Sequence, residues 1–231
     1  MYIDRDKFIA AQRSGNAEWV QATPVPWSLV SNEPFTLDKL GPYYKYNPTE
    51  GKKLMVEAGF VDGKMQIQSP TAYVPPGFTP RITLAQELWK KEGVEMSIIA
   101  MDFPTYSPYY YLRSHPDIGL TFQNTGDFSL NWFAQNKFST DASQNTAYIN
   151  DSEVQRIVKE IKTTSDPAKL REYARFLWDF DTLGMWNIWF PAERAYSVIS
   201  PRLRNYTIRV GNTYTGGEFL PWLASAPRTS P

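Results

Sequence analysis

The sequence predicts an α/β fold in which strands and helices alternate over residues 1–190. Three observations predict it: short stretches of alternating polar and apolar residues, longer stretches with apolar residues three and four apart, and proline in the first turn of several expected helices. The chain is also long and apolar enough to bury a core, since 42% of its 231 residues are hydrophobic.

Capping residues indicate where the expected helices begin. The pairs Asn47–Pro48, Thr79–Pro80 and Asp166–Pro167 each place an N-cap before a proline at the first helical position. Asp4 and Ser152 cap two further helices. In chain order, the expected elements are a helix over 4–13, an ordered loop over 19–46 with at most one helical turn, a helix over 48–58, a strand over 64–69, a helix over 80–92, a strand over 94–98, a helix over 104–113, a strand over 117–122, a turn over 123–128, helices over 152–161 and 167–183, and a strand over 185–190.

Two of these strands frame a helix. Residues 64–69 and 94–98 each alternate between apolar and polar side chains, and an amphipathic helix lies between them. We expect the two strands to pair in parallel, because a helical crossover returns the chain in the same direction. The strongest amphipathic helix of the chain is expected over 152–161.

The composition excludes several classes of function. With 24 basic and 24 acidic residues and no basic run, the chain is a poor candidate for binding nucleic acid. The absence of cysteine and the single histidine, His115, exclude disulfides, zinc–cysteine sites and multi-histidine metal sites. No stretch approaches the roughly 20 apolar residues of a membrane span. A metal site made of Asp and Glu, or a pair of carboxylates, needs neither cysteine nor histidine and stays possible, but we expect no cofactor and no bound metal.

Four segments, in this order, resemble the C-terminal half of the family 5 extracellular solute-binding proteins of ABC importers, the oligopeptide-, dipeptide- and nickel-binding type. They are Ile3–Arg5, Tyr46–Phe60, Gln86–Ile98 and Tyr148–Val154. The resemblance implies a periplasmic-binding-protein-like type II lobe over 1–192, with a mixed sheet flanked by helices. Residues 193–231 would then be a return segment that completes an absent first lobe, and the chain would be a C-terminal fragment.

The resemblance also implies a function. Proteins of this family bind a peptide or another small organic solute in a cleft between two lobes, close around it by a hinge motion, and deliver it to the permease subunits of the transporter. They work in the periplasm or at the extracellular face of the membrane, to which the permease or an N-terminal lipid anchor attaches them. No catalytic residue is implied.

The loop after the third expected strand is the candidate ligand site, because loops at the carboxyl ends of parallel strands line the crevice of α/β folds. In peptide-binding members of the family an aspartate of this loop receives the amino group of the ligand. When this loop is aligned without gaps to the loop of the family, with Trp132–Phe133 as the anchor, Thr125 takes the position of that aspartate. A peptide with a free amino group is therefore disfavoured, unless Asp127 receives the amino group instead. Alternatively, Asp127 caps a helix that begins near Phe128. The ligand-binding candidates are Phe122, Asn124, Thr125, Asp127, Trp132 and Trp27.

Two other functions stay open. Aromatic residues make up 15% of the chain, which suits stacking on sugars, and a carboxylate-based hydrolase acting on a carbohydrate would need two facing acids. Asp179 with Asp181, or Glu92 with Glu95, are available pairs, although neither lies in a loop at a strand end. The third possibility is a structural or interaction domain that binds no small molecule.

Overall fold

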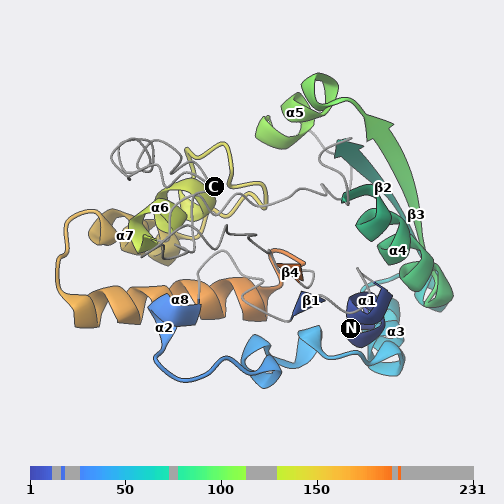
Figure 1. Cartoon of the computed structure of the whole chain (residues 1–231), viewed down its shortest axis with the longest axis horizontal. Helices are drawn as coiled ribbons and strands as arrows, with labels where there is room; N and C mark the ends of the chain where they lie inside the picture. The colour runs from blue at the N-terminus through green and yellow to red at the C-terminus, as the bar shows by residue number, and fades with distance from the viewer. Residues whose placement is uncertain (12–16, 19–26, 73–77, 113–128, 189–191, 194–231) are drawn as a thin grey trace, which may run out of the picture.

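The computed structural model describes residues 1–11, 17–18, 27–72, 78–112, 129–188 and 192–193 (Figure 1). The described part has the α/β character expected from the sequence and is rich in helices. Its elements are α1 (Arg5–Ala11), β1 (Ala17–Glu18), α2 (Trp27–Val30), the 3-10 turns η2 (Leu37–Leu40) and η3 (Pro42–Tyr44), α3 (Pro48–Glu57), the 3-10 turn η4 (Val61–Gly63), β2 (Met65–Ala72), α4 (Phe78–Lys91), β3 (Val94–Met101), α5 (Phe103–Tyr111), α6 (Leu130–Phe133), the π-helical turn η5 (Ala134–Phe138), α7 (Ser152–Ile161), α8 (Pro167–Gly184) and β4 (Ala192–Glu193).

The caps confirm three of the expected helix starts. Before α1, the Asp4 carboxylate accepts a hydrogen bond from the Lys7 N–H at 3.0 Å. Before α3, the Asn47 side-chain oxygen accepts one from the Glu50 N–H at 3.1 Å. Before α8, the Asp166 carboxylate accepts one from the Ala168 N–H at 2.9 Å. Each cap satisfies a backbone donor that has no partner within its helix.

The cap of α7 differs from the expectation. Asp151, not Ser152, is the N-cap, because the Asp151 carboxylate accepts hydrogen bonds from the N–H groups of Glu153 and Val154 at 2.9 and 3.0 Å. Ser152 is the first helical residue instead. A serine and an aspartate side by side are both good caps, so the pattern alone left the boundary uncertain by one residue.

Two other expectations are wrong. The stretch 19–46 contains α2, η2 and η3 in its described part, rather than one helical turn. The strand expected over 185–190 is absent from the described residues 185–188, because Met185 adopts a left-handed conformation with φ of 52° and ends α8. A left-handed residue turns the chain out of the helix and does not continue it as a strand.

The sheet formed by β2 and β3 confirms the expected parallel pair. The register runs from Met65 opposite Val94 to Ala72 opposite Met101, and α4 connects the two strands. A second, antiparallel pair joins β1 to β4. The third strand expected over 117–122 lies outside the described residues, as does the segment 194–231.

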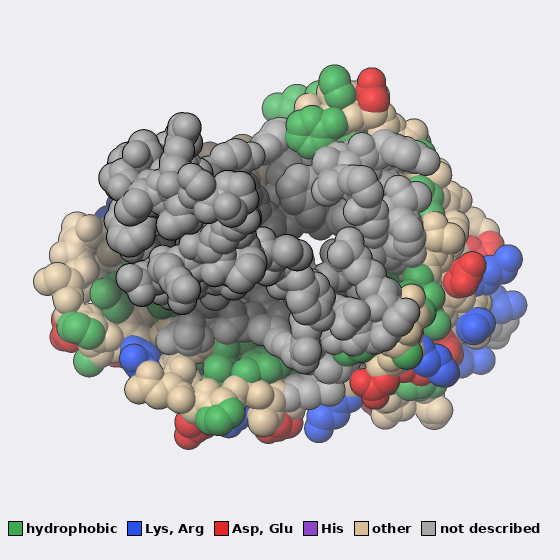
Figure 2. Space-filling model, in the orientation of Figure 1, with side chains coloured by type: hydrophobic (Ala, Val, Ile, Leu, Met, Phe, Trp, Pro, Cys, Tyr) green, Lys and Arg blue, Asp and Glu red, His purple; other side chains and the backbone are tan. Residues whose placement is uncertain are grey.

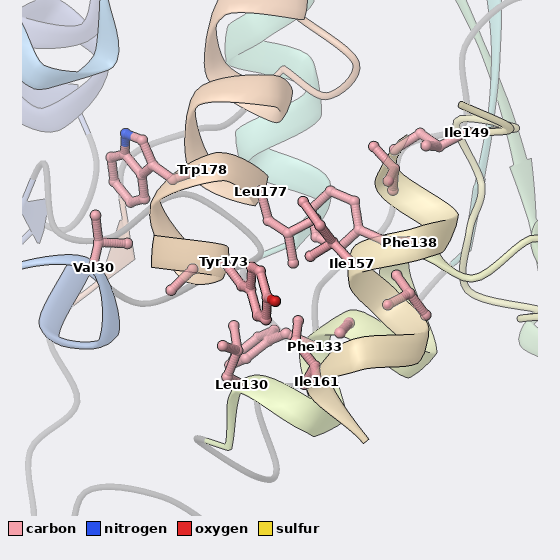
Figure 3. Packing of buried hydrophobic residues seen from close by; sticks show 14 of the residues in the cluster. Val30, Leu130, Phe133, Phe138, Ile149, Ile157, Ile161, Tyr173, Leu177 and Trp178 are labelled. Carbon is pink, nitrogen blue, oxygen red and sulfur yellow. The ribbon is translucent and has the colours of Figure 1, made fainter. Parts of the chain in front are cut away.

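Two hydrophobic cores hold these elements. The smaller one lies where α1 and α4 pack against β2 and β3, and it includes the fully buried Phe8 and the nearly buried Ile82. The larger one lies between α6, α7 and α8; Figure 3 shows Tyr173 and Leu177 of α8 facing Phe138 and the apolar side of α7. The face of α7 predicted from its apolar spacing is the buried face, with Val154, Ile157, Val158 and Ile161 all buried.

A chain of hydrogen bonds connects the helices of the two cores. The buried guanidinium of Arg5 in α1 donates to the Tyr44 carbonyl oxygen at 2.8 Å. The Tyr44 hydroxyl donates to the Asn187 carbonyl oxygen at 2.9 Å. The Asn187 side-chain amide then donates to the buried Asp181 carboxylate of α8 at 2.6 Å. Residues from both ends of the described chain therefore meet through polar contacts as well as through the β1–β4 pair.

Charges of both signs lie together on part of the described surface. Figure 2 shows Lys, Arg, Asp and Glu side chains interspersed near α3 and the ends of α4. This mixture agrees with the formal net charge of zero and gives that part of the surface no field of a single sign.

Candidate functional site

Four of the six expected ligand-binding residues lie outside the described residues. Phe122, Asn124, Thr125 and Asp127 all belong to the segment 113–128. Ser129, directly after the candidate loop, and Trp132 belong to the described residues. They lie in the helical segment that follows the loop.

The segment α6–η5 begins at a cap formed by Ser129. The Ser129 hydroxyl oxygen accepts a hydrogen bond from the Trp132 N–H at 3.1 Å. The helix thus starts at Leu130, two residues later than expected. Its N-cap is Ser129, whereas one alternative from the sequence was a cap formed by Asp127. This cap fixes where Trp132 lies with respect to the end of the loop.

Trp132 is half-buried at the edge of the larger core. Its ring meets Phe133 edge to face, with 5.2 Å between the ring centroids and 89° between the planes. The Asn136 amide donates to the Trp132 carbonyl oxygen at 2.9 Å. One side of the indole is therefore held by the core, and the residue keeps part of its surface exposed.

Lys137 lies beside this indole and was not predicted from the sequence. Its side chain is 9% exposed, and its Nζ lies 5.8 Å from the centroid of the Trp132 ring, within the range of a cation–π contact. Burial lowers the pKa of the Lys137 ammonium from its ordinary 10.5 to about 8. Among the described residues, no carboxylate pairs with this ammonium.

The signal that could have revealed Lys137 is the spacing of its neighbours. Leu130, Phe133, Ala134 and Phe138 are buried and follow the apolar spacing of an amphipathic helix. Lys137 occupies a position of that same stripe, where an apolar residue is the usual choice.

Trp27 lies in the core, not at a surface. It is 3% exposed, and its ring packs edge to face against Trp178 and Phe35, with centroids 4.9 and 6.0 Å away. Its indole N–H donates to the Glu33 carbonyl oxygen at 2.7 Å. This placement gives Trp27 a packing role in the core.

Three of the four acids considered for hydrolysis are engaged with other groups. Asp179 pairs with Arg175 at 2.8 Å, and Asp181 is buried against the Asn187 amide. Glu92 accepts a hydrogen bond from the Tyr46 hydroxyl at 2.6 Å. Within the described ranges, no group of three His, Cys, Asp or Glu residues is arranged to hold a metal ion. The helices of the same ranges include none with the length and apolarity needed to cross a bilayer.

No protein-family model matches the sequence. No curated protein matches it either. The solved structures give clear similarities. HbpA2 from Haemophilus parasuis matches with a TM-score of 0.69 and 16% identity over 83% of this chain and 38% of its own. The periplasmic binding protein DppA from Helicobacter pylori, associated with an ABC transporter and solved with the peptide STSA, matches with a TM-score of 0.66 and 16% identity over 83% of this chain and 36% of its own.

A third structure matches over most of both chains. It is described as the peptide-binding protein of a peptide ABC transporter, and it has a TM-score of 0.67 and 14% identity over 84% of this chain and 87% of its own. The chain thus spans less than two fifths of the first two proteins and nearly all of the third. At these identities the comparisons show the fold: the chain has the architecture of one part of a periplasmic-binding-protein-like molecule.

Proposed function

We propose that this chain is the second ligand-binding lobe of a solute-binding protein that serves an ABC importer. The observation that carries the proposal is its fold, which it shares with binding proteins over 83% of its length. The placement of Trp132 supports it, because a partly exposed indole follows directly after the loop in which a ligand site was expected. Pockets for small ligands typically combine aromatic surface with a few polar groups.

The proposed mechanism is closure of two lobes around a solute. An opposing lobe, completed by residues 193–231, would supply the other half of the contacts, and the bound solute would favour the closed state. Permease subunits at the periplasmic or extracellular face of the membrane would recognise that state. The role is non-catalytic, which agrees with the engagement of Asp179, Asp181 and Glu92 by other residues.

In this proposal the solute is a peptide or other small organic molecule, and a free amino group at the loop is disfavoured unless Asp127 receives it. The family resemblance places Thr125 at the position of the aspartate that receives an ammonium, and an ammonium buried without a counter-charge is costly. N-acetylated peptides should therefore bind at least as well as the same peptides with a free amino terminus.

The test is a thermal-shift screen of the full chain. The panel contains free and N-acetylated peptides, oligosaccharides and small organic acids, and each mixture is also analysed for products by mass spectrometry. Saturable stabilisation without turnover is the expected result, since a ligand that binds only the folded state raises its stability. Hydrolysis of an oligosaccharide would overturn the proposal in favour of a carbohydrate hydrolase, and a panel without any stabilising compound would overturn the binding role.

A further inference from the structure

We propose that Lys137, held over the Trp132 ring by the π-helical turn η5, forms a subsite for a carboxylate group of the solute. This inference rests on the proposed function, since it assigns a part of the ligand to a part of the lobe. It concerns a residue of the helical segment behind the loop, not one of the loop residues expected from the sequence.

Lys137 lies in an apolar part of the fold. Its neighbours on the apolar stripe of α6–η5 are 8% exposed or less, and Lys137 itself is nine-tenths buried. A methionine or leucine would pack there without desolvating a charge, whereas a buried ammonium without a counter-charge is costly. A cation in such a place indicates a requirement other than packing.

The Lys137 ammonium contacts an aromatic ring and lacks a counter-ion among the described residues. The face of the Trp132 ring lies near Lys137 Nζ, and within the described part of the chain no carboxylate neutralises the ammonium. A cation–π contact attracts the ammonium but leaves its positive charge without an anion. A carboxylate brought by a ligand would supply the missing charge and a charge-assisted hydrogen bond.

The local backbone sets the position of Lys137 relative to Trp132. In a regular α-helix, residues five apart point about 140° away from each other. Here the Ser139 N–H bonds to the Ala134 carbonyl oxygen at 3.1 Å, five residues earlier, so the helix widens into a π-turn. The wider turn brings Lys137 back over Trp132. Such turns are often found at functional sites.

A carboxylate fits this subsite better than a phosphate. One ammonium supplies one positive charge and three donors, which matches a single carboxylate. Phosphate groups are usually held by arginine forks or by several backbone N–H groups. Arg156 of α7, the helix in contact with η5, does not provide this, because it is paired with Glu153 and Glu160.

The experiment compares benzoate with benzamide, two probes of the same shape that differ in charge. Their binding to the full chain is measured by thermal shift and calorimetry, for wild type and for Lys137→Met. Benzoate should bind wild type more tightly than benzamide does, and Lys137→Met should bind benzoate about tenfold to a hundredfold more weakly. Lys159→Met, which removes an exposed lysine of α7, is the matched control and should behave as wild type.

A second variant guards against misfolding. Lys137→Arg keeps the positive charge and should keep the preference for benzoate. Equal binding of benzoate by wild type and Lys137→Met would overturn the subsite, as would equal binding of benzoate and benzamide by wild type, or no binding of benzoate. The proposed function fails separately, because it is judged by the whole solute panel: a panel with stabilising solutes but no dependence on Lys137 leaves the binding role intact.

Discussion

Replacing Lys137 by methionine should make the folded chain more stable, although it removes the proposed carboxylate subsite. The lowering of the Lys137 pKa from 10.5 to about 8 corresponds to roughly 3 kcal/mol of unfavourable desolvation at neutral pH. The cation–π contact with Trp132 recovers about 1 kcal/mol of this. We therefore expect Lys137→Met to raise the free energy of unfolding by about 2 kcal/mol and the Tm by about 4–8 °C.

The difference in stability between wild type and Lys137→Met should depend on pH. Because the pKa of Lys137 is lower in the folded chain than in the unfolded chain, the unfolded state binds more protons between about pH 8 and 10.5. Wild type should therefore gain stability from this group as the pH rises through that range. The excess of the free energy of unfolding of Lys137→Met over that of wild type should be constant below about pH 8 and decrease above it.

Urea denaturation of wild type, Lys137→Met and the control Lys159→Met, each at several pH values, measures both effects. Comparison between variants cancels the titration of all other groups. If Lys137→Met is no more stable than wild type at pH 7, or if the difference does not narrow above pH 8, then Lys137 is not a desolvated cation and the reasoning fails.

Three further substitutions test the structure around the site by denaturation. Ser129→Ala should cost about 1 kcal/mol, because the cap of α6 loses its acceptor, and an unchanged stability would mean that α6 begins elsewhere. Asn145→Ala should cost about 3 kcal/mol, since this buried amide makes three hydrogen bonds to the backbone of the turn before α7; a loss below 1 kcal/mol would contradict that network. Leu177→Ala should cost about 3 kcal/mol, because it opens a cavity in a fully buried part of the larger core. Arg156→Met, at an exposed position, should change the free energy of unfolding little. A larger loss of stability for Arg156→Met than for Leu177→Ala would refute the burial pattern.

Local signals in the sequence predicted most of the regular elements. The starts of α3 and α8 were predictable because Asn47 and Asp166 each precede a proline, and caps of this type act within one turn. The parallel pairing of β2 and β3 was predictable because a helix of the right length separates two alternating stretches.

Features that depend on distant contacts were not predictable in this way. α2 forms in a proline-rich stretch because Trp27 and Val30 pack into the core formed with α8. The region after Gly184 looked like a strand by composition, yet Met185 turns the chain so that the Asn187 carbonyl meets Tyr44. Tertiary packing overrides local propensity at both places.

The candidate site was predicted only in part. Trp132 was chosen for its place after the loop, and its role in binding stays a prediction. Trp27 was chosen for its residue type and lies in the core. Lys137 was missed because a lysine in a sequence is normally assumed to face water. Its apolar neighbours were visible in the sequence, but the π-turn that sets it over the indole was not.

The pairing of β1 with β4 has a consequence for how the chain acquires its structure. Ala17 lies opposite Glu193, so this ribbon closes a loop that contains almost all of the described chain. The ribosome synthesises the N-terminal residues first, so β1 can pair with β4 only after α8 and the residues that follow it have been synthesised. The hydrogen bond from the Tyr44 hydroxyl to the Asn187 carbonyl oxygen likewise forms only after α8 has been synthesised. We expect the two cores to form early from neighbouring segments, and the closing ribbon to form last, because long loops lose the most entropy when their ends meet.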